Sequence, residues 1–173
     1  MKTDNRNTTP ESQARSRVQD LNNPQGVDIK EISLVQATAG LHILAPLINK
    51  CQMQTIWDLC RKGEERAYFK QQVMDLARLI KTIPKTYEQD GSGMEAIAYL
   101  HYFTAGFDWY ITEKDMTGDG TSQAFGLAVV FERELGYISI REIIANGAEL
   151  DLYWTPATLS ALANGRTINV STG

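Results

Sequence analysis

The sequence has few of the features on which metal, redox and membrane functions depend. It contains two cysteines and two histidines, and their positions do not resemble a zinc site. Cys51 and Cys60 lie nine positions apart in a helical-looking segment, on different parts of the helix surface, so we expect no disulfide between them. The apolar run of about 18 residues that a transmembrane helix requires is also missing. We therefore expect no metal site, no cofactor and no membrane contact.

Motifs of the common enzyme classes are absent as well. The chain has no G-x-S-x-G or P-loop pattern, and no G-x-G-x-x-G follows a predicted strand. The first residues, MKTDNRNTTPESQARSR, are polar and lack the apolar core of a secretory signal. These observations favour a soluble, cytoplasmic protein that is not an enzyme.

Positive and negative charge are separated along the chain, whose net charge is −4. Residues 1–87 contain 13 Lys and Arg against 9 Asp and Glu, whereas residues 88–173 contain 4 against 12. The first half is therefore net +4 and the second net −8, which predicts two surfaces with different partners or two solvated faces of opposite sign. The acidic second half disfavours contact with duplex phosphates, because that contact is largely electrostatic.

The first half contains the signals of a helical block. Residues 1–26 are polar with almost no aliphatic side chains, and we expect a disordered or peripheral tail there. Residues 27–86 predict three short helices, because apolar residues recur at helical spacing between a Ser33 N-cap and Pro84. Residues 87–94 are expected to form a hinge to the second half.

The second half changes to the two-residue alternation of β-strands. Residues 95–165 predict an α+β domain, with one strand over 96–103. Ser139 and Glu142 have the spacing of a capping box that opens a short helix, and Thr155-Pro156 is expected to open another. Further strands are expected at 108–113, 124–131 and 135–138, and a frayed end at 166–173. These patterns predict an α+β fold, in which an N-terminal helical block packs on a small, mainly antiparallel sheet with short C-terminal helices.

Three stretches of the second half carry a family resemblance. They read FDWYITEKD, AFGLAVVFERELGYISIREI and LDLYWTPATLSAL, and they keep the order and spacing of W-Y-x-T-E, F-G-L, E-L-G-Y-x-S-x-x-E and D-L-Y-x-x-P-x-x-L. In this respect residues 95–162 resemble domain-of-unknown-function family 2958. The resemblance supplies no activity, cofactor or catalytic residue. It implies a genetic setting on plasmids and other mobile elements, beside anti-restriction and conjugation genes.

Four carboxylates of the second half are the candidates for catalysis: Glu113, Glu134, Glu142 and Asp151. If they converged, they could carry out acid–base or two-metal chemistry. Each also has a structural interpretation. Glu113 would belong to a solvated hairpin tip and Glu134 to a turn. Glu142 would complete the capping box, and Asp151 would bond to the backbone that follows it. The Gly-rich loop 114–122 echoes a calcium loop but lacks its regular oxygen ligands. His101 alternates with aromatic residues, so we expect a packed, hydrogen-bonded histidine rather than a general base.

Aromatic residues provide the candidate binding surface: Trp109, Tyr110, Tyr137, Tyr153 and Trp154. Aromatic side chains on a sheet mostly belong to the core. Five of them in an acidic domain nevertheless leave room for one or two exposed anchors at a protein interface, where Trp and Tyr are favoured. Stacking on single-stranded nucleic acid is the alternative, which the surrounding acidity disfavours.

The sequence thus supports three functional hypotheses. The first is a non-catalytic interaction protein of a mobile element, which binds a host or element protein and blunts a DNA-targeting defence of the restriction or CRISPR type. The second is a small metal-dependent hydrolase or nuclease that uses the four carboxylates. The third is a nucleic-acid-binding accessory factor, whose basic helices contact phosphates through Lys50, Arg61, Lys62 and Arg66.

Overall fold

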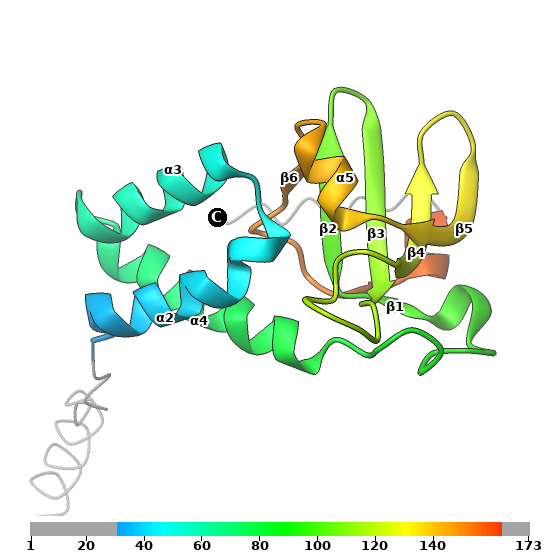
Figure 1. The fold of residues 1–173 in the computed structure, drawn as a ribbon, viewed down its shortest axis with the longest axis horizontal. Helices are drawn as coiled ribbons and strands as arrows, with labels where there is room; N and C mark the ends of the chain where they lie inside the picture. The colour runs from blue at the N-terminus through cyan, green and yellow to red at the C-terminus, as the bar shows by residue number, and fades with distance from the viewer. Residues whose placement is uncertain (1–30, 164–173) are drawn as a thin grey trace, which may run out of the picture. The chain divides into compact units, whose positions relative to one another are not determined.

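The α+β class predicted from the sequence is confirmed in a computed structural model that describes residues 31–163. Helices come first along the chain, followed by a mainly antiparallel sheet and short C-terminal helices (Figure 1). The tails expected at 1–26 and 166–173 lie outside the described residues. The described residues from Ile32 to Ala163 belong to one compact unit. None of the described helices is long and apolar enough to cross a membrane.

The helical block consists of α2 (Leu34–Leu44), α3 (Lys50–Arg61) and α4 (Arg66–Thr82), with a 3₁₀ turn η1 (Ala45–Leu47) after α2. Ser33 caps α2 as predicted, and Gln36 completes a capping box by accepting the Ser33 N–H. Gly63, with a φ of 86°, separates α3 from α4. Both cysteines are free thiols, as expected.

A glycine allows two of these helices to approach each other closely. A Cβ atom at Gly40 on α2 would lie 2.8 Å from Cγ1 of Val73 on α4. Glycine is a poor helix former, so its presence inside α2 weakens that helix by itself. Glycine is needed at this position because any larger residue would collide with α4.

The main sheet has five strands in the order β5-β4-β3-β2-β6, and all neighbours are antiparallel. The strands are β2 (Leu100–Thr104), β3 (Phe107–Glu113), β4 (Ala124–Val129), β5 (Arg133–Ile138) and β6 (Glu149–Leu150). The short helix α5 (Ile140–Ala145) follows β5, and Ser139 Oγ accepts the N–H of Glu142 at its start, as the predicted cap requires.

Two sequence predictions in this half need correction. The strand predicted over 96–103 is interrupted at Tyr99: its first part, β1 (Ile97–Ala98), pairs with β7 (Ala157–Thr158) in a separate two-stranded sheet. The last helix, α6 (Leu159–Ala163), begins after β7 and not at Thr155-Pro156. Thr158 is the residue that caps it, because its Oγ1 accepts the N–H of Ala161.

The two faces of the main sheet are buried to different extents. One face joins the helices in a continuous core, in which Tyr102 is fully buried and donates its hydroxyl to the carbonyl of Leu47. The opposite face is covered by a smaller apolar cluster around Leu127 and Leu159, which involves β1 and α6. Because side chains alternate along a strand, Phe125 and Tyr137 point to this second face, while their neighbours Ala124 and Ile138 belong to the helix-side core.

Two cross-strand partners, Gly126 and Gly136, provide a matched test of strand packing. A Cβ at Gly126 would collide with the backbone oxygen of Tyr110 and lie 3.0 Å from Cα of Ile111. A Cβ at Gly136 would meet nothing within 4 Å. We expect Gly126→Ala to lower the free energy of unfolding by about 1–3 kcal/mol, as overpacking does, and Gly136→Ala to change it by less than about 0.5 kcal/mol. Urea unfolding measures both, and equal effects would contradict the described close approach of β3 and β4.

Candidate functional site

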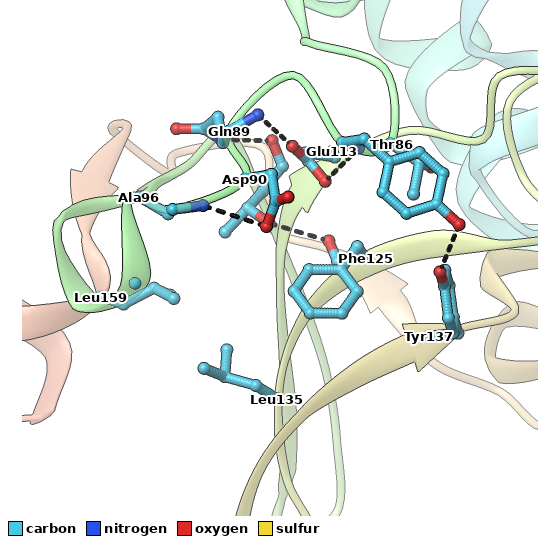
Figure 2. A pocket seen from close by; sticks show the side chains of 13 residues that line it. Thr86, Gln89, Asp90, Ala96, Glu113, Phe125, Leu135, Tyr137 and Leu159 are labelled. Atoms are coloured by element: carbon cyan, nitrogen blue, oxygen red, sulfur yellow. Dashed lines mark hydrogen bonds between the residues drawn. The ribbon is translucent and has the colours of Figure 1, made fainter.

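A cavity of about 350 Å³ lies between residues 86–96 and the second face of the sheet (Figure 2). Its apolar lining includes Phe125, Leu135 and Leu159, and its polar rim includes Tyr87 and Tyr137. The hydroxyl groups of these two tyrosines are hydrogen bonded to each other at 2.8 Å. The cavity is thus lined by apolar side chains together with a hydrogen-bonded tyrosine pair.

A buried carboxylate holds one wall of this cavity. Glu113, at the end of β3, is 4% exposed, and its carboxylate accepts the backbone N–H of Tyr87 at 3.1 Å and that of Gln89. Such charge-assisted bonds compensate a carboxylate for the loss of water. Glu113, a catalytic candidate in the sequence, therefore has a structural role in this arrangement.

Tyr87 is held in an unfavourable backbone conformation by these contacts. Tyr87 has a φ of 79° and is, among the described residues, the one non-glycine residue with a positive φ. Such a conformation costs on the order of 1 kcal/mol and persists where the surroundings determine it. Here the backbone N–H is fixed by Glu113 and the side-chain hydroxyl by Tyr137.

The side chain of Gln89 attaches the same segment to two strands. Its amide nitrogen donates to the carbonyls of Thr112 and Ile97, and its amide oxygen accepts the N–H of Ile97. The predicted hinge at 87–94 is thus hydrogen bonded to both β1 and β3. It forms the wall of the cavity.

His101 lies between two carboxylates on the same face of the sheet. Its Nε2 is 2.8 Å from Asp108 Oδ1 and its Nδ1 is 3.1 Å from Asp151 Oδ2, while the ring stacks on Tyr110 at 4.7 Å between centroids. Burial disfavours the charged ring, but the hydrogen bonds to Asp151 and Asp108 outweigh it and raise the pKa of His101. The bond to His101 in turn lowers the pKa of Asp151. Because both ring nitrogens are occupied, the geometry fits the packed histidine expected from the sequence.

The other catalytic candidates do not join a common group. Glu134 is exposed on β5, Glu142 is exposed in the first turn of α5, and Asp151 contacts His101 and the N–H of Tyr153. Within residues 31–163, no three His, Cys, Asp or Glu side chains are placed so that they could hold a metal ion. In the Gly-rich loop, Asp115 and Asp119 accept bonds from Thr117 and Thr121 of the loop itself.

The five aromatic candidates divide into a half-buried and an exposed group. Trp109 packs against the helix-side core, and Tyr110 and Trp154 pack against the second cluster. Tyr137 and Tyr153 are 58% and 68% exposed. Of these two, Tyr137 lines the cavity.

Sequence reasoning did not select Tyr87, Phe125 or Leu135 as parts of this surface. Leu135 alternates with Tyr137, and this spacing was the available signal that the two share a face. That the shared face is exposed depends on the position of β5 at the end of the sheet.

The four basic candidates are divided between the two ends of α3. Lys50 begins this helix and Arg61 ends it, about 16 Å apart along the axis. Near the second end, Lys62 pairs with Asp58 at 3.5 Å, Arg66 donates to the carbonyl of Gly63, and Arg61 lies over the ring of Trp57.

Comparisons with protein-family models, with curated proteins and with solved structures find no match for this chain. The resemblance to domain-of-unknown-function family 2958 therefore stays a prediction.

Replacing the buried carboxylate tests its role in holding residues 87–89. We expect Glu113→Gln to lower the free energy of unfolding by about 1–3 kcal/mol, because an amide replaces a charged acceptor of two backbone N–H groups. Amide hydrogen exchange at Tyr87 and Gln89 should become faster. The control is Glu88→Gln, which alters an exposed carboxylate that accepts the N–H of Lys85. Equal effects of the two variants would contradict the assignment.

The cluster around His101 predicts a pH dependence of stability. The pKa of His101 in the folded protein lies above its ordinary value of 6.5. His101 therefore contributes fully to the free energy of unfolding below about pH 6.5, and this contribution is lost as the pH rises through the pKa of the folded state. We expect the free energy of unfolding to fall over that range in the wild type and to fall less in His101→Gln. Urea unfolding between pH 5.5 and 8.5 measures this. The control, His42→Gln, changes an exposed histidine on α2 and should retain the wild-type slope.

Proposed function

We propose that this chain is a non-catalytic protein-interaction protein, which binds its partner through the cavity face formed by Tyr87, Leu135, Tyr137 and Phe125. The observation that carries the proposal is the exposure of large apolar side chains around one cavity. Tyr87, Leu135 and Tyr137 are 64%, 47% and 58% exposed and all line it. Exposed apolar patches beside a concave surface are typical of binding sites.

The tyrosines are suited to be anchors because their positions are already fixed. Tyr87 and Tyr137 are hydrogen bonded to each other, and Tyr137 also packs edge-on against Phe125 at 5.6 Å between centroids. A side chain ordered before binding loses little conformational entropy when the partner arrives. Tyrosine is among the residues that dominate interface energetics.

The polar groups of the second half support a binding role over catalysis. Glu113 is bonded to backbone amides, and both nitrogens of His101 face carboxylates. A general base needs a free acceptor within reach of the substrate proton. Within residues 31–163, no specific contact favours the alternative of a metal-dependent hydrolase or nuclease.

The proposed setting is the cytoplasm of a cell that carries a mobile genetic element. The resemblance to domain-of-unknown-function family 2958 supports this part of the proposal. The partner is then a host or element protein, and the effect is inhibition of a DNA-targeting defence of the restriction or CRISPR type.

The anchor residue provides the test. We expect Tyr137→Ala to weaken partner binding by about tenfold or more, as truncation of an interface anchor does. The control is Tyr68→Ala, which removes a tyrosine of similar exposure, 52%, from α4. The tagged wild type and both variants are used for capture from a bacterial lysate with and without nuclease treatment, followed by quantitative mass spectrometry.

A partner retained by Tyr68→Ala and lost by Tyr137→Ala supports the proposal. A partner captured equally by both variants would place the binding surface elsewhere. If all partners disappear after nuclease treatment, the nucleic-acid alternative through Lys50, Arg61, Lys62 and Arg66 is favoured instead.

A further inference from the structure

We infer that the partner binds as an added strand: an extended, basic segment pairs with the free edge of β5 and places an apolar side chain in the cavity. This inference rests on the proposed function and specifies the partner chemistry for the same surface. Strand addition to a sheet edge is an established mode of peptide recognition, in which main-chain hydrogen bonds supply affinity and pockets supply specificity.

The two ends of the sheet differ in how their backbone edges are closed. At the β6 end, the side-chain amide of Gln52 accepts the N–H of Leu150 and donates to its carbonyl. The side-chain amide of Gln89 closes β1 in the same way at Ile97. Two separate strands are thus capped by glutamine from outside the sheet.

The edge of β5 has no such closure in the described part of the chain. All six residues of β5 pair with β4 without a register shift. In the described part of the chain, no strand pairs with the other side of β5. The strand reads RELGYI: its charged residues, Arg133 and Glu134, lie at its beginning, and Leu135 to Ile138 contain no charge and no proline to protect the edge. The outward N–H and C=O groups of β5 are therefore open to another strand.

The side-chain pattern of β5 connects this edge to the cavity. Leu135 and Tyr137 point to the cavity face, and a Cβ at Gly136 between them would meet nothing within 4 Å. Side chains directly opposite on paired strands lie about 5 Å apart. Alternate residues of an added strand would therefore lie beside Leu135 and Tyr137, at the opening of the cavity.

Charge indicates which kind of segment this edge accepts. Residues 88–163 contain 12 Asp and Glu against 3 Lys and Arg. Glu134 on β5 and Glu132 just before this strand are exposed, and the guanidinium of Arg133 is bonded to the carbonyl of Ala163. A basic segment is complementary to this surface. A second copy of the chain, added through the same edge, would bring two acidic surfaces together.

The experiment uses a phage-displayed library of random ten-residue linear peptides, selected against the full chain. We expect enrichment of peptides with Lys or Arg flanking alternating apolar residues and with little proline. Binding of the best peptide should weaken about fivefold in Glu134→Lys, because one attraction becomes a repulsion. The matched control is Glu149→Lys, the same charge change at the closed β6 edge, where affinity should stay within about twofold.

A second readout detects strand addition directly. With bound peptide, amide hydrogen exchange should slow in residues 133–138, because added main-chain hydrogen bonds protect the outer edge. Enrichment of acidic or proline-rich peptides, equal effects of the two charge reversals, unchanged exchange in β5, or no enrichment would each overturn the inference.

The two proposals fail in different ways. If peptides or the lysate partner bind through Tyr137 without slowing exchange in β5, the interaction function stands and strand addition is wrong. If the lysate partner binds Tyr137→Ala as tightly as wild type, the cavity face is not its binding surface, and the proposed function is wrong in that part.

Discussion

The cavity face depends on the two hydrogen bonds that the Glu113 carboxylate accepts. Glu113 lies at the end of β3, the central strand of the sheet, and accepts the backbone amides of Tyr87 and Gln89. The segment after α4 is thereby held against the sheet, with Tyr87 at positive φ beside Tyr137. A buried charge is acceptable at this place because amide dipoles replace the water it loses. Among the contacts of this segment, this carboxylate is the one that fixes the backbone N–H of Tyr87.

The unequal covering of the two sheet faces explains why a binding surface exists at all. The helices bury one face in a continuous core, whereas β1, β7 and α6 cover only part of the other. Phe125, Leu135 and Tyr137 occupy the part left open. The strand order places β5 at the edge of the sheet. Within residues 31–163, no glutamine side chain bonds to this edge, whereas glutamines bond to β6 and β1.

The acidic half of the chain uses one histidine to join three of its segments. His101 on β2 contacts Asp108 on β3 and Asp151 after β6, and aromatic rings of Tyr110 and Trp154 enclose it. A protonated imidazole donates to both carboxylates and offsets their repulsion. A histidine with an acidic neighbour at each nitrogen is thus a connecting element of the fold, in keeping with the packed histidine expected from the sequence.

Local interactions determined what the sequence alone could predict, and long-range pairing decided the rest. The Ser33 cap, the end of α3 before Gly63 and the Ser139 cap depend on hydrogen bonds and backbone angles within a few residues. The α+β class follows from the change of apolar period. By contrast, the interruption at Tyr99 arises because β1 pairs with β7, about sixty residues later. The bonding of Glu113 to residues 87 and 89 and the edge position of β5 depend equally on contacts between distant segments, which no local pattern encodes.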